Sequence, residues 1–232
     1  ERCVRTVDRR VPVIAGSGTN STASSIALSK AAQSAGVDAL LTVTPYYNKT
    51  TQRGLIKHFF AVADAVDKPI ILYNVPSRTG VNIKPETCAE LAKHEKICAI
   101  KEASGSISAV AEIRCHCGDA LDIYSGNDDQ IVPILSLGGK GVISVLSNLL
   151  PAETHKICAD FFAGNVKASA DAQIKYLPLI DSLFCEVNPI PVKEAMHLLG
   201  FCDREIRLPL CEMEDKNLER LANDMRNAGL SF

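Results

Sequence analysis

Lys101 is the residue whose type and position most directly suggest chemistry. It ends a short apolar run, residues 97–101, and a loop of small polar residues, 102–105, follows at once. A run of that length bounded by turn residues indicates a buried strand, so the amine lies where a sheet interior opens to a loop. Apolar surroundings disfavour the charged form of an amine, and a neutral lysine can form a Schiff base with a carbonyl substrate. The ordinary alternative is a strand-end lysine whose ammonium lies in water.

Three more polar side chains follow neighbouring apolar runs. Tyr47 comes after one run, Tyr73 ends the next, and Arg78 lies in the loop beyond it. Active sites of α/β proteins lie at the carboxyl ends of their strands, so these side chains are expected near Lys101. Each has an ordinary alternative, as core filler or as a surface charge. Together they fit one reaction class, in which a lysine captures a carbonyl, a tyrosine moves protons and an arginine holds a carboxylate.

The elements that must position these residues alternate between strand-like and helical patterns. The apolar runs predict strands at 11–15, 39–43, 69–73, 97–101, 121–124 and 141–145. The intervening patterns predict helices at 22–35, 52–66, 85–94, 107–117 and 128–137. Beyond residue 150 only helices are predicted, near 151–163, 166–185, 190–199 and 215–228. Repeating βα units with continuous apolar strands predict a parallel sheet covered by helices, for which an open doubly wound sheet and a (β/α)8 barrel compete.

Composition and charge exclude several classes of protein. The chain has 232 residues, of which 47% are hydrophobic and 22% charged, and this is ordinary globular composition. Its net charge of −2 argues against a nucleic-acid partner. No stretch has transmembrane length or the pattern of a signal peptide, so no membrane partner is expected. Nine cysteines, an odd number without an export signal, point to reduced thiols and to the cytoplasm.

No motif for a metal or an organic cofactor stands out. Cys115, His116 and Cys117 are adjacent, which does not match the spacing of structural zinc sites, and we interpret them as a helix end before Gly118. The segment 16–18, Gly-Ser-Gly, lacks the third glycine and the later acidic residue of a dinucleotide fingerprint. We therefore expect neither a metal nor an organic cofactor.

Two segments give the chain a resemblance to a known family. Residues 73–80 read Tyr-Asn-Val-Pro-Ser-Arg-Thr-Gly, and residues 101–105 read Lys-Glu-Ala-Ser-Gly. With further matches at 44–48, 141–145 and 188–193, the chain resembles the dihydrodipicolinate synthase family of pyruvate-dependent class I aldolases. The Ser-Arg-Thr-Gly part is the more specific, because it separates the synthases from sialic acid lyase and its relatives. The resemblance covers essentially the whole chain.

The resemblance implies a TIM barrel, that is, a (β/α)8 barrel with a C-terminal helical extension. The six visible strands would be strands three to eight. Residues 1–150 would then form a partial barrel that lacks about its first two βα units, and residues 151–232 a helical region packed on it. A full barrel runs to about 250 residues, so two missing units amount to about 60. The family's Gly-Thr-Thr-Gly-Glu segment, at the end of the second strand, is also absent from this sequence.

The resemblance also implies roles for Lys101 and for the three polar residues at neighbouring strand ends. Lys101 would form the Schiff base with pyruvate. Tyr73 would donate and accept protons during imine and enamine formation. Tyr47 would extend a proton relay into the site of a neighbouring subunit across a tight dimer. Arg78 would bind the carboxylate of aspartate semialdehyde.

The remaining implied residues would line the pyruvate pocket or bind a regulator. The backbone around Gly126 and Ile143 would line the pocket. Asn20 and Tyr46 match the pattern of an allosteric lysine site, but Ser24 stands where lysine-sensitive members carry a glutamate. Because a serine cannot pair with an ammonium, Ser24 argues against strong inhibition by lysine.

The implied function is the condensation of pyruvate with L-aspartate 4-semialdehyde to 4-hydroxy-tetrahydrodipicolinate, in lysine and diaminopimelate biosynthesis. No cofactor would be needed, because the lysine imine is itself the electron sink. A dimer or tetramer is expected. One alternative is another aldolase of the family, such as N-acetylneuraminate lyase or a 2-keto-3-deoxy sugar acid aldolase, although Arg78 favours a small acid. The other alternative is a barrel fragment without activity that acts only as a folded or assembly unit.

Overall fold

The computed structural model describes all 232 residues, which divide into two compact units. The first unit comprises Glu1–Gly126 and Ser136–Gly141. The second comprises Asn127–Leu135 and Val142–Phe232. None of the helices combines the length and the apolar character that crossing a bilayer requires.

Six strands alternate with helices along the chain, as the sequence predicted. The strands are β1 (Ile14–Gly16), β2 (Ala39–Val43), β3 (Ile70–Asn74), β4 (Ile97–Glu102), β5 (Asp122–Ser125) and β6 (Gly141–Val142). They follow one another in chain order in a single sheet, and β1 to β5 pair in parallel. The predicted α/β class with a parallel sheet is therefore confirmed.

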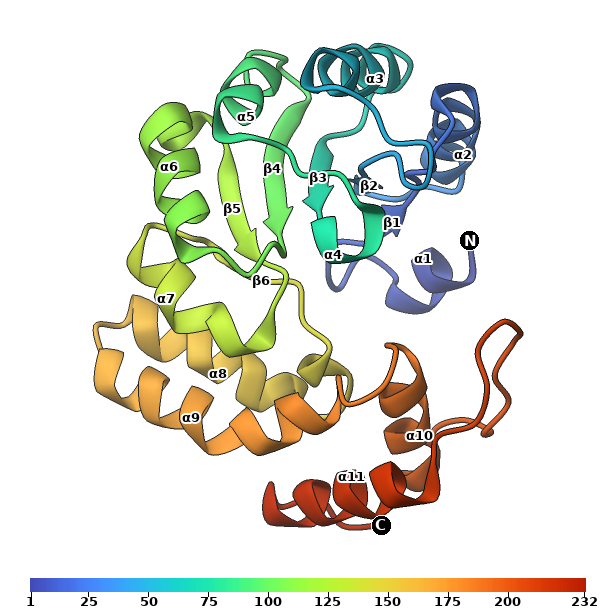
Figure 1. Ribbon diagram of the computed structural model, residues 1–232, viewed down its shortest axis with the longest axis vertical. Coiled ribbons are helices and arrows are strands. Elements are labelled where there is room, and N and C mark those ends of the chain that lie inside the picture. Colours follow the sequence, from blue (N-terminus) through green and yellow to red (C-terminus); the bar gives the residue numbers. More distant parts are fainter. The chain divides into compact units, whose positions relative to one another are not determined.

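The helices of the first unit lie along the sheet, with α2 beside α3, α3 beside α5 and α5 beside α6 (Figure 1). They are α1 (Arg2–Val7), α2 (Thr22–Ser34), α3 (Gln52–Asp64), α4 (Pro76–Thr79), α5 (Pro85–Leu91) and α6 (Ile107–Cys117), followed by the 3-10 turn η1 (Gly118–Ala120). Ser21, Thr51 and Ser106 cap the N-termini of α2, α3 and α6, because the side-chain oxygen of each accepts a backbone N–H of the first turn. The short helix α4 was not predicted.

The two faces of the sheet differ in burial. One row of register partners is fully buried and consists of Thr42, Leu72, Ile100 and Ile123. The next row points to the other face and is only partly buried, and it consists of Val43, Tyr73, Lys101 and Tyr124. Successive residues of a strand point to opposite faces, so Tyr73 and Lys101 share a face and a level in the sheet.

Strand β1 is shorter than predicted at its start. The sequence suggested a strand at 11–15, but the ladder begins at Ile14. Pro12 has no N–H to donate, and the Val13 N–H donates instead to the Asp38 carboxylate at 2.7 Å. A side chain from the next loop thus replaces the first strand pairing.

The second unit is helical. Its elements are η2 (Asp128–Gln130), α7 (Ile131–Ser136, whose last residue belongs to the first unit), η3 (Leu146–Asn148), α8 (Pro151–Phe162), α9 (Val166–Ser182), α10 (Ile190–Leu198) and α11 (Asp215–Asn227). Its core is built mainly of aliphatic side chains, among them Leu149, Ile157, Leu179, Leu183 and Leu221. The four helices predicted beyond residue 150 are all present, each within about three residues of its predicted end.

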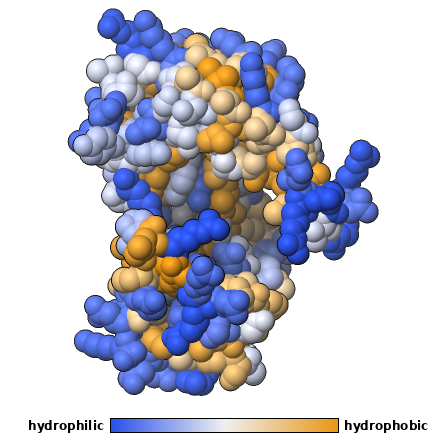
Figure 2. All heavy atoms as spheres, turned by 90° about the vertical axis from the view of Figure 1, so that its right-hand side faces the viewer, coloured by the Kyte–Doolittle hydropathy of each residue, from blue (hydrophilic) through white to orange (hydrophobic).

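Large hydrophobic side chains also reach the surface of both units. They include Val11, Tyr47, Ile174, Phe201 and Leu208. Figure 2 shows one face on which hydrophobic areas alternate with hydrophilic ones. Apolar atoms make up more than half of an ordinary protein surface, so scattered side chains of this kind do not by themselves mark a binding site.

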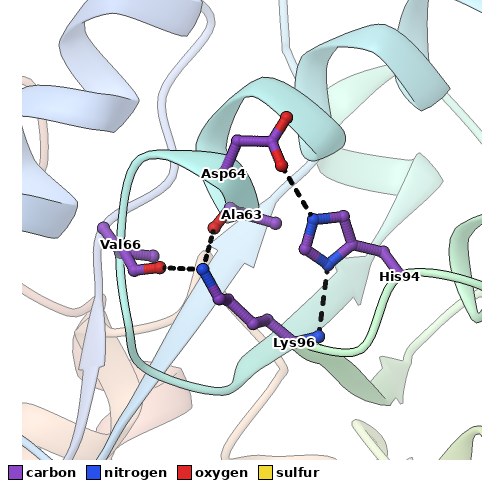
Figure 3. Close-up of polar contacts among 5 residues, drawn as sticks. All are labelled: Ala63, Asp64, Val66, His94 and Lys96. Atoms are coloured by element: carbon purple, nitrogen blue, oxygen red, sulfur yellow. Dashed lines mark hydrogen bonds and ion pairs between the residues drawn. The ribbon is translucent and has the colours of Figure 1, made fainter.

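Polar contacts fasten the start of β4 to the end of α3 (Figure 3). The Lys96 ammonium donates to the carbonyl oxygens of Ala63 at 3.3 Å and Val66 at 2.7 Å. The Nδ1 atom of His94 accepts the Lys96 backbone N–H at 3.2 Å, and its Nε2 atom lies 3.2 Å from the Asp64 carboxylate. A cation bonded to the carbonyls that end a helix also complements the helix dipole. This cluster therefore stabilises the connection between the C-terminus of α3 and the first residue of β4.

Replacing Lys96 with methionine is expected to lower the free energy of unfolding by about 1 to 2 kcal/mol, because two carbonyls lose a charged donor. Methionine keeps most of the apolar stem, so the loss reports on the hydrogen bonds. Urea unfolding followed by circular dichroism measures the change. An unfolding free energy equal to that of the unmodified chain would show that water satisfies these carbonyls equally well.

Candidate active site

Lys101 and Tyr73 meet on the partly buried face of the sheet. They are register partners on β4 and β3, and the Lys101 Nζ atom lies 4.3 Å from the centre of the Tyr73 ring. This distance is that of a cation–π contact. The amine thus lies against a ring that carries a proton-donating hydroxyl, which is the combination that imine chemistry requires.

The hydroxyl of Tyr73 is held in its protonated form. Burial raises the pKa of Tyr73 above its usual value, and the positive charge of Arg78 partly opposes this rise. Arg78 lies on α4, which begins with Pro76 and is followed by Gly80, a residue with φ of 69°. Proline at the first helical position and glycine in a left-handed conformation start and stop this single turn, so Arg78 is held directly beyond β3.

Tyr73 and Arg78 line a cavity of about 430 Å³. Its other walls are Gly16, Gly18, Leu41, Val43, Tyr46, Val75 and Thr79. The lining is largely apolar, with the phenols of Tyr46 and Tyr73 and the guanidinium of Arg78 as its main polar groups. Pockets of this kind bind small molecules, and an arginine at the wall favours an acid.

Gly126 lies against the aliphatic chain of Lys101. A Cβ atom at this position would lie 2.6 Å from the Ala103 Cβ and 3.2 Å from the Lys101 Cε. The Gly126 N–H donates to the Glu102 carbonyl at 2.7 Å, which holds the chain after β5 in this position. Only glycine allows so close an approach to the lysine.

Replacing Gly126 with alanine is expected to slow imine formation on Lys101 by about tenfold or more, because the added methyl group displaces Ala103 or the lysine. The rate of borohydride-trapped adduct formation with pyruvate measures this. The double variant Gly126→Ala/Ala103→Gly removes the closer overlap and should recover part of the rate. Trapping by the single variant at the unmodified rate would contradict the prediction.

Tyr47 does not line the cavity that holds Tyr73. Its side chain is 84% exposed, and its backbone is left-handed, with φ of 69°. Lys49, two residues later, is also left-handed, with φ of 60°. The loop after β2 therefore presents the Tyr47 phenol to the outside of the chain.

Asn20 and Tyr46 lie on two different cavities. Tyr46 lines the cavity shared with Tyr73 and Arg78. Asn20 lines a separate cavity of about 270 Å³, whose other walls are Thr22, Pro45, Lys49, Thr50, Gly54, Lys57 and His58. Within one chain, the two residues of the expected lysine site therefore do not share a pocket.

In the second unit, Asp128 holds the loop that carries Ile143. The buried carboxylate of Asp128 accepts the N–H groups of Val145 and Leu146, both at 2.9 Å. These bonds take the place of further strand pairing, so β6 ends at Val142 and not at residue 145, as the sequence suggested. Sequence reasoning missed Asp128, although a carboxylate between an apolar strand and an apolar helix pattern is itself a signal.

Sequence reasoning also missed a buried pair behind Tyr73 and Lys101. Asn74 and Glu102 are the next register partners along β3 and β4, and they are 1% and 2% exposed. The Asn74 Nδ2 donates to the Glu102 Oε2 at 2.8 Å. The signal was available, because alternation puts Glu102 on the buried face of the sheet, where a carboxylate needs a partner.

The residues 115–117 form a helix end. Helix α6 ends at Cys117, with Gly118 next, which confirms this interpretation of the sequence. Nowhere do three or more His, Cys, Asp or Glu side chains gather so that they could hold a metal ion. All nine cysteines are free thiols.

The fold and the site define a class of protein. Parallel βα units carry a lysine, a tyrosine and an arginine at the carboxyl ends of neighbouring strands, which is where α/β enzymes bind their substrates. Residues 1–228 match the sequence model of the Dihydrodipicolinate synthetase family. The chain belongs to this family.

Named relatives agree with this membership. The chain is 59% identical over 227 residues to the 4-hydroxy-tetrahydrodipicolinate synthase of Clostridium perfringens strain SM101, which covers 98% of this chain and 78% of that protein. The dihydrodipicolinate synthase structure from Thermotoga maritima matches with a TM-score of 0.96 at 43% identity, over 98% of this chain and 79% of its own. The Acinetobacter baumannii dihydrodipicolinate synthase, solved in complex with pyruvate, matches with a TM-score of 0.95 at 42% identity. The match covers 97% of this chain and 78% of that chain.

Proposed function

We propose that this chain is a lyase that condenses pyruvate with L-aspartate 4-semialdehyde to 4-hydroxy-tetrahydrodipicolinate, in lysine and diaminopimelate biosynthesis. Its family and the names of its relatives support this reaction. The observation that carries it is the Lys101 amine, 4.3 Å from the ring of Tyr73, which itself lines a cavity with Arg78. The reaction belongs to the class I aldolase type, in which the imine replaces a metal or an organic cofactor as electron sink.

In the proposed mechanism, the neutral amine of Lys101 attacks the keto carbon of pyruvate. Tyr73 protonates the departing hydroxyl, and water leaves as the imine forms. Loss of a proton from the methyl carbon then gives an enamine, with Tyr73 as the proton carrier. The enamine carbon attacks the aldehyde of the second substrate. The amino group of that substrate finally displaces Lys101 from the imine carbon, which closes the ring and frees the lysine.

Arg78 is proposed to hold the carboxylate of aspartate semialdehyde through two hydrogen bonds. Its place on the wall of the same cavity as Tyr73 supports this role. The backbone around Gly126 and Ile143 is proposed to line the pyruvate pocket, and the contact of Gly126 with Lys101 supports its part. The relative from Acinetobacter baumannii was solved with pyruvate bound.

Tyr47 is proposed to complete a proton relay in a neighbouring subunit of a dimer or tetramer. The 84% exposure of its side chain is compatible with a role outside its own chain. Asn20 and Tyr46 are proposed to contribute to a lysine-binding site, with weak inhibition because Ser24 replaces an acidic partner. The proposed location is the cytoplasm, where biosynthetic enzymes of this kind act.

The six strands are proposed to correspond to strands three to eight of a (β/α)8 barrel, with residues 1–150 as the barrel part and 151–232 as the helical region. The parallel pairing of β1 to β5 in chain order supports this assignment. The chain spans 78% of the length of the Clostridium perfringens relative.

Incubation with pyruvate and borohydride tests the proposal. One reduced pyruvate should be fixed to Lys101, as shown by intact mass and peptide mapping, and an adduct on another lysine would refute the assignment. Turnover with aspartate semialdehyde, but not with N-acetylneuraminate or 2-keto-3-deoxy sugar acids, would exclude the other aldolases. A folded chain that forms no adduct would favour the inactive-fragment alternative.

A further inference from the structure

We propose that Asn74 and Glu102 are positioning residues, which fix Lys101, Tyr73 and Arg78 relative to one another. This inference rests on the proposed function, because it assigns the pair a role in imine chemistry at Lys101. Neither residue is proposed to touch substrate. Both lie on the buried face of the sheet, and each directly follows a proposed catalytic residue in its strand.

The Asn74 amide is bonded to two segments other than its own strand. Its Nδ2 atom donates to the Glu102 Oε2 and to the Asn82 Oδ1, both at 2.8 Å. Its Oδ1 atom accepts the Ile83 N–H at 3.0 Å. Asn74 itself ends β3, Glu102 ends β4, and residues 82–83 follow the short helix that carries Arg78. One side chain therefore joins the three segments from which the proposed chemistry comes.

The Glu102 carboxylate completes this arrangement. Its second oxygen, Oε1, accepts the Ser104 N–H at 2.6 Å, which fixes the loop after β4. Both carboxylate oxygens thus have a donor, although the side chain is only 2% exposed. The donors and acceptors match in one way only, because the amide nitrogen of Asn74 must face the carboxylate and its oxygen must face a backbone N–H.

Stability alone does not explain a buried carboxylate at this place. Replacing buried charged groups with well-packed apolar ones is often neutral or stabilising, whereas leaving a buried charge without its partner is costly. The pair provides a fixed geometry. It holds the ends of β3 and β4 together at the residues that directly follow Tyr73 and Lys101. Displacements of about 1 Å at such groups lower rates by about 100-fold.

Single substitutions should therefore lower kcat more than they weaken pyruvate binding. Asn74→Asp places two carboxylates 2.8 Å apart at the Asn74–Glu102 bond. Glu102→Gln introduces an amide donor at a position where the Asn74 Nδ2 and the Ser104 N–H already donate. Each is expected to lower kcat by about tenfold or more, with a KM for pyruvate within about threefold of the unmodified value.

The reciprocal double variant, Asn74→Asp/Glu102→Gln, is the decisive test. The amide nitrogen introduced at position 102 can donate to the carboxylate introduced at position 74, and the new amide oxygen can still accept the Ser104 N–H. The pair keeps one negative charge, and the exposed Asn82 can turn its amide to donate. We expect kcat of the double variant to recover to within about threefold of the unmodified chain.

Lys96→Met is the matched control, because Lys96 directly precedes the first residue of β4, whereas Glu102 is its last residue. It should lower stability and leave kcat unchanged. Melting curves and circular dichroism identify the variants that fold. If the single variants do not fold, kcat of the folded double variant decides the question alone.

Three outcomes separate the two proposals. If the unmodified chain forms no pyruvate adduct, the proposed function fails, and with it the role of the pair. If the adduct forms but the folded single variants keep full kcat, only the positioning role is refuted. A folded double variant that stays about tenfold or more below the unmodified kcat also refutes it.

Discussion

Replacing Lys101 with alanine is expected to abolish adduct formation with pyruvate and to lower kcat by at least about 1000-fold. The amine is the only group proposed to form a covalent bond, and no other lysine lies against Tyr73 at 4.3 Å. Without it, the substrates can be held but the keto carbon cannot be converted into an enamine. Borohydride trapping and steady-state assays with aspartate semialdehyde measure the two effects.

Lys101→Arg is the control for charge. Arginine keeps the positive charge and the contact with the tyrosine ring, but its guanidinium stays protonated at every accessible pH and cannot add to a carbonyl. It should be as inactive as the alanine variant, but its melting temperature should be closer to that of the unmodified chain. An arginine or alanine variant that retains the adduct, or a sizeable fraction of kcat, would move the nucleophile to another residue.

Replacing Tyr73 with phenylalanine is expected to lower kcat by about 100- to 10,000-fold, because the proton carrier is lost. Phenylalanine keeps the aromatic face against Lys101, so the cation–π contact and the packing of β3 should persist. The KM for pyruvate should change little. Burial keeps the pKa of Tyr73 above its usual value, so the hydroxyl that is removed would have been a proton donor throughout the neutral range.

Tyr124→Phe is the matched control for this variant. Tyr124 is the register partner of Lys101 on the other side, on β5, and it is also a partly buried tyrosine. Loss of its hydroxyl should leave kcat within about threefold of the unmodified value. If both phenylalanine variants lose activity equally, the proton carrier is not specifically Tyr73. If neither loses activity, Tyr73 has only a packing role.

The order and type of the elements could be predicted because strands and helices here have clear local signals. Apolar runs of about five residues bounded by turn residues became β2, β3 and β4 with little error. Apart from the unpredicted helix α4, two errors in strand length lie where a distant side chain accepts a backbone N–H. Asp38 does so before β1 and Asp128 does so after β6. The position of Asp128 between two apolar patterns is a signal of burial, but its backbone partners lie 17 and 18 residues further along the chain and are not defined by any local pattern.

In the candidate site, too, general rules predicted some contacts, whereas others depend on residues that are distant in the sequence. That Lys101 and Tyr73 would meet followed from a general rule, because the carboxyl ends of neighbouring parallel strands lie at one edge of the sheet. The hydrogen bonds of Asn74 and Glu102 did not follow, because they depend on the register of β3 and β4. Register is a property of the folded sheet, and the sequence of either strand alone does not define it.

The left-handed backbone at Tyr47 and Lys49 has a consequence for how this chain can change. Such a conformation costs an ordinary side chain about 1 to 2 kcal/mol, whereas glycine adopts it freely and asparagine does so easily. A chain selected for stability alone would carry one of those residues at position 47. The tyrosine there therefore costs stability, and the proposed proton relay through its exposed phenol would account for its presence. Replacing it with glycine would then raise the melting temperature at the expense of that proposed relay.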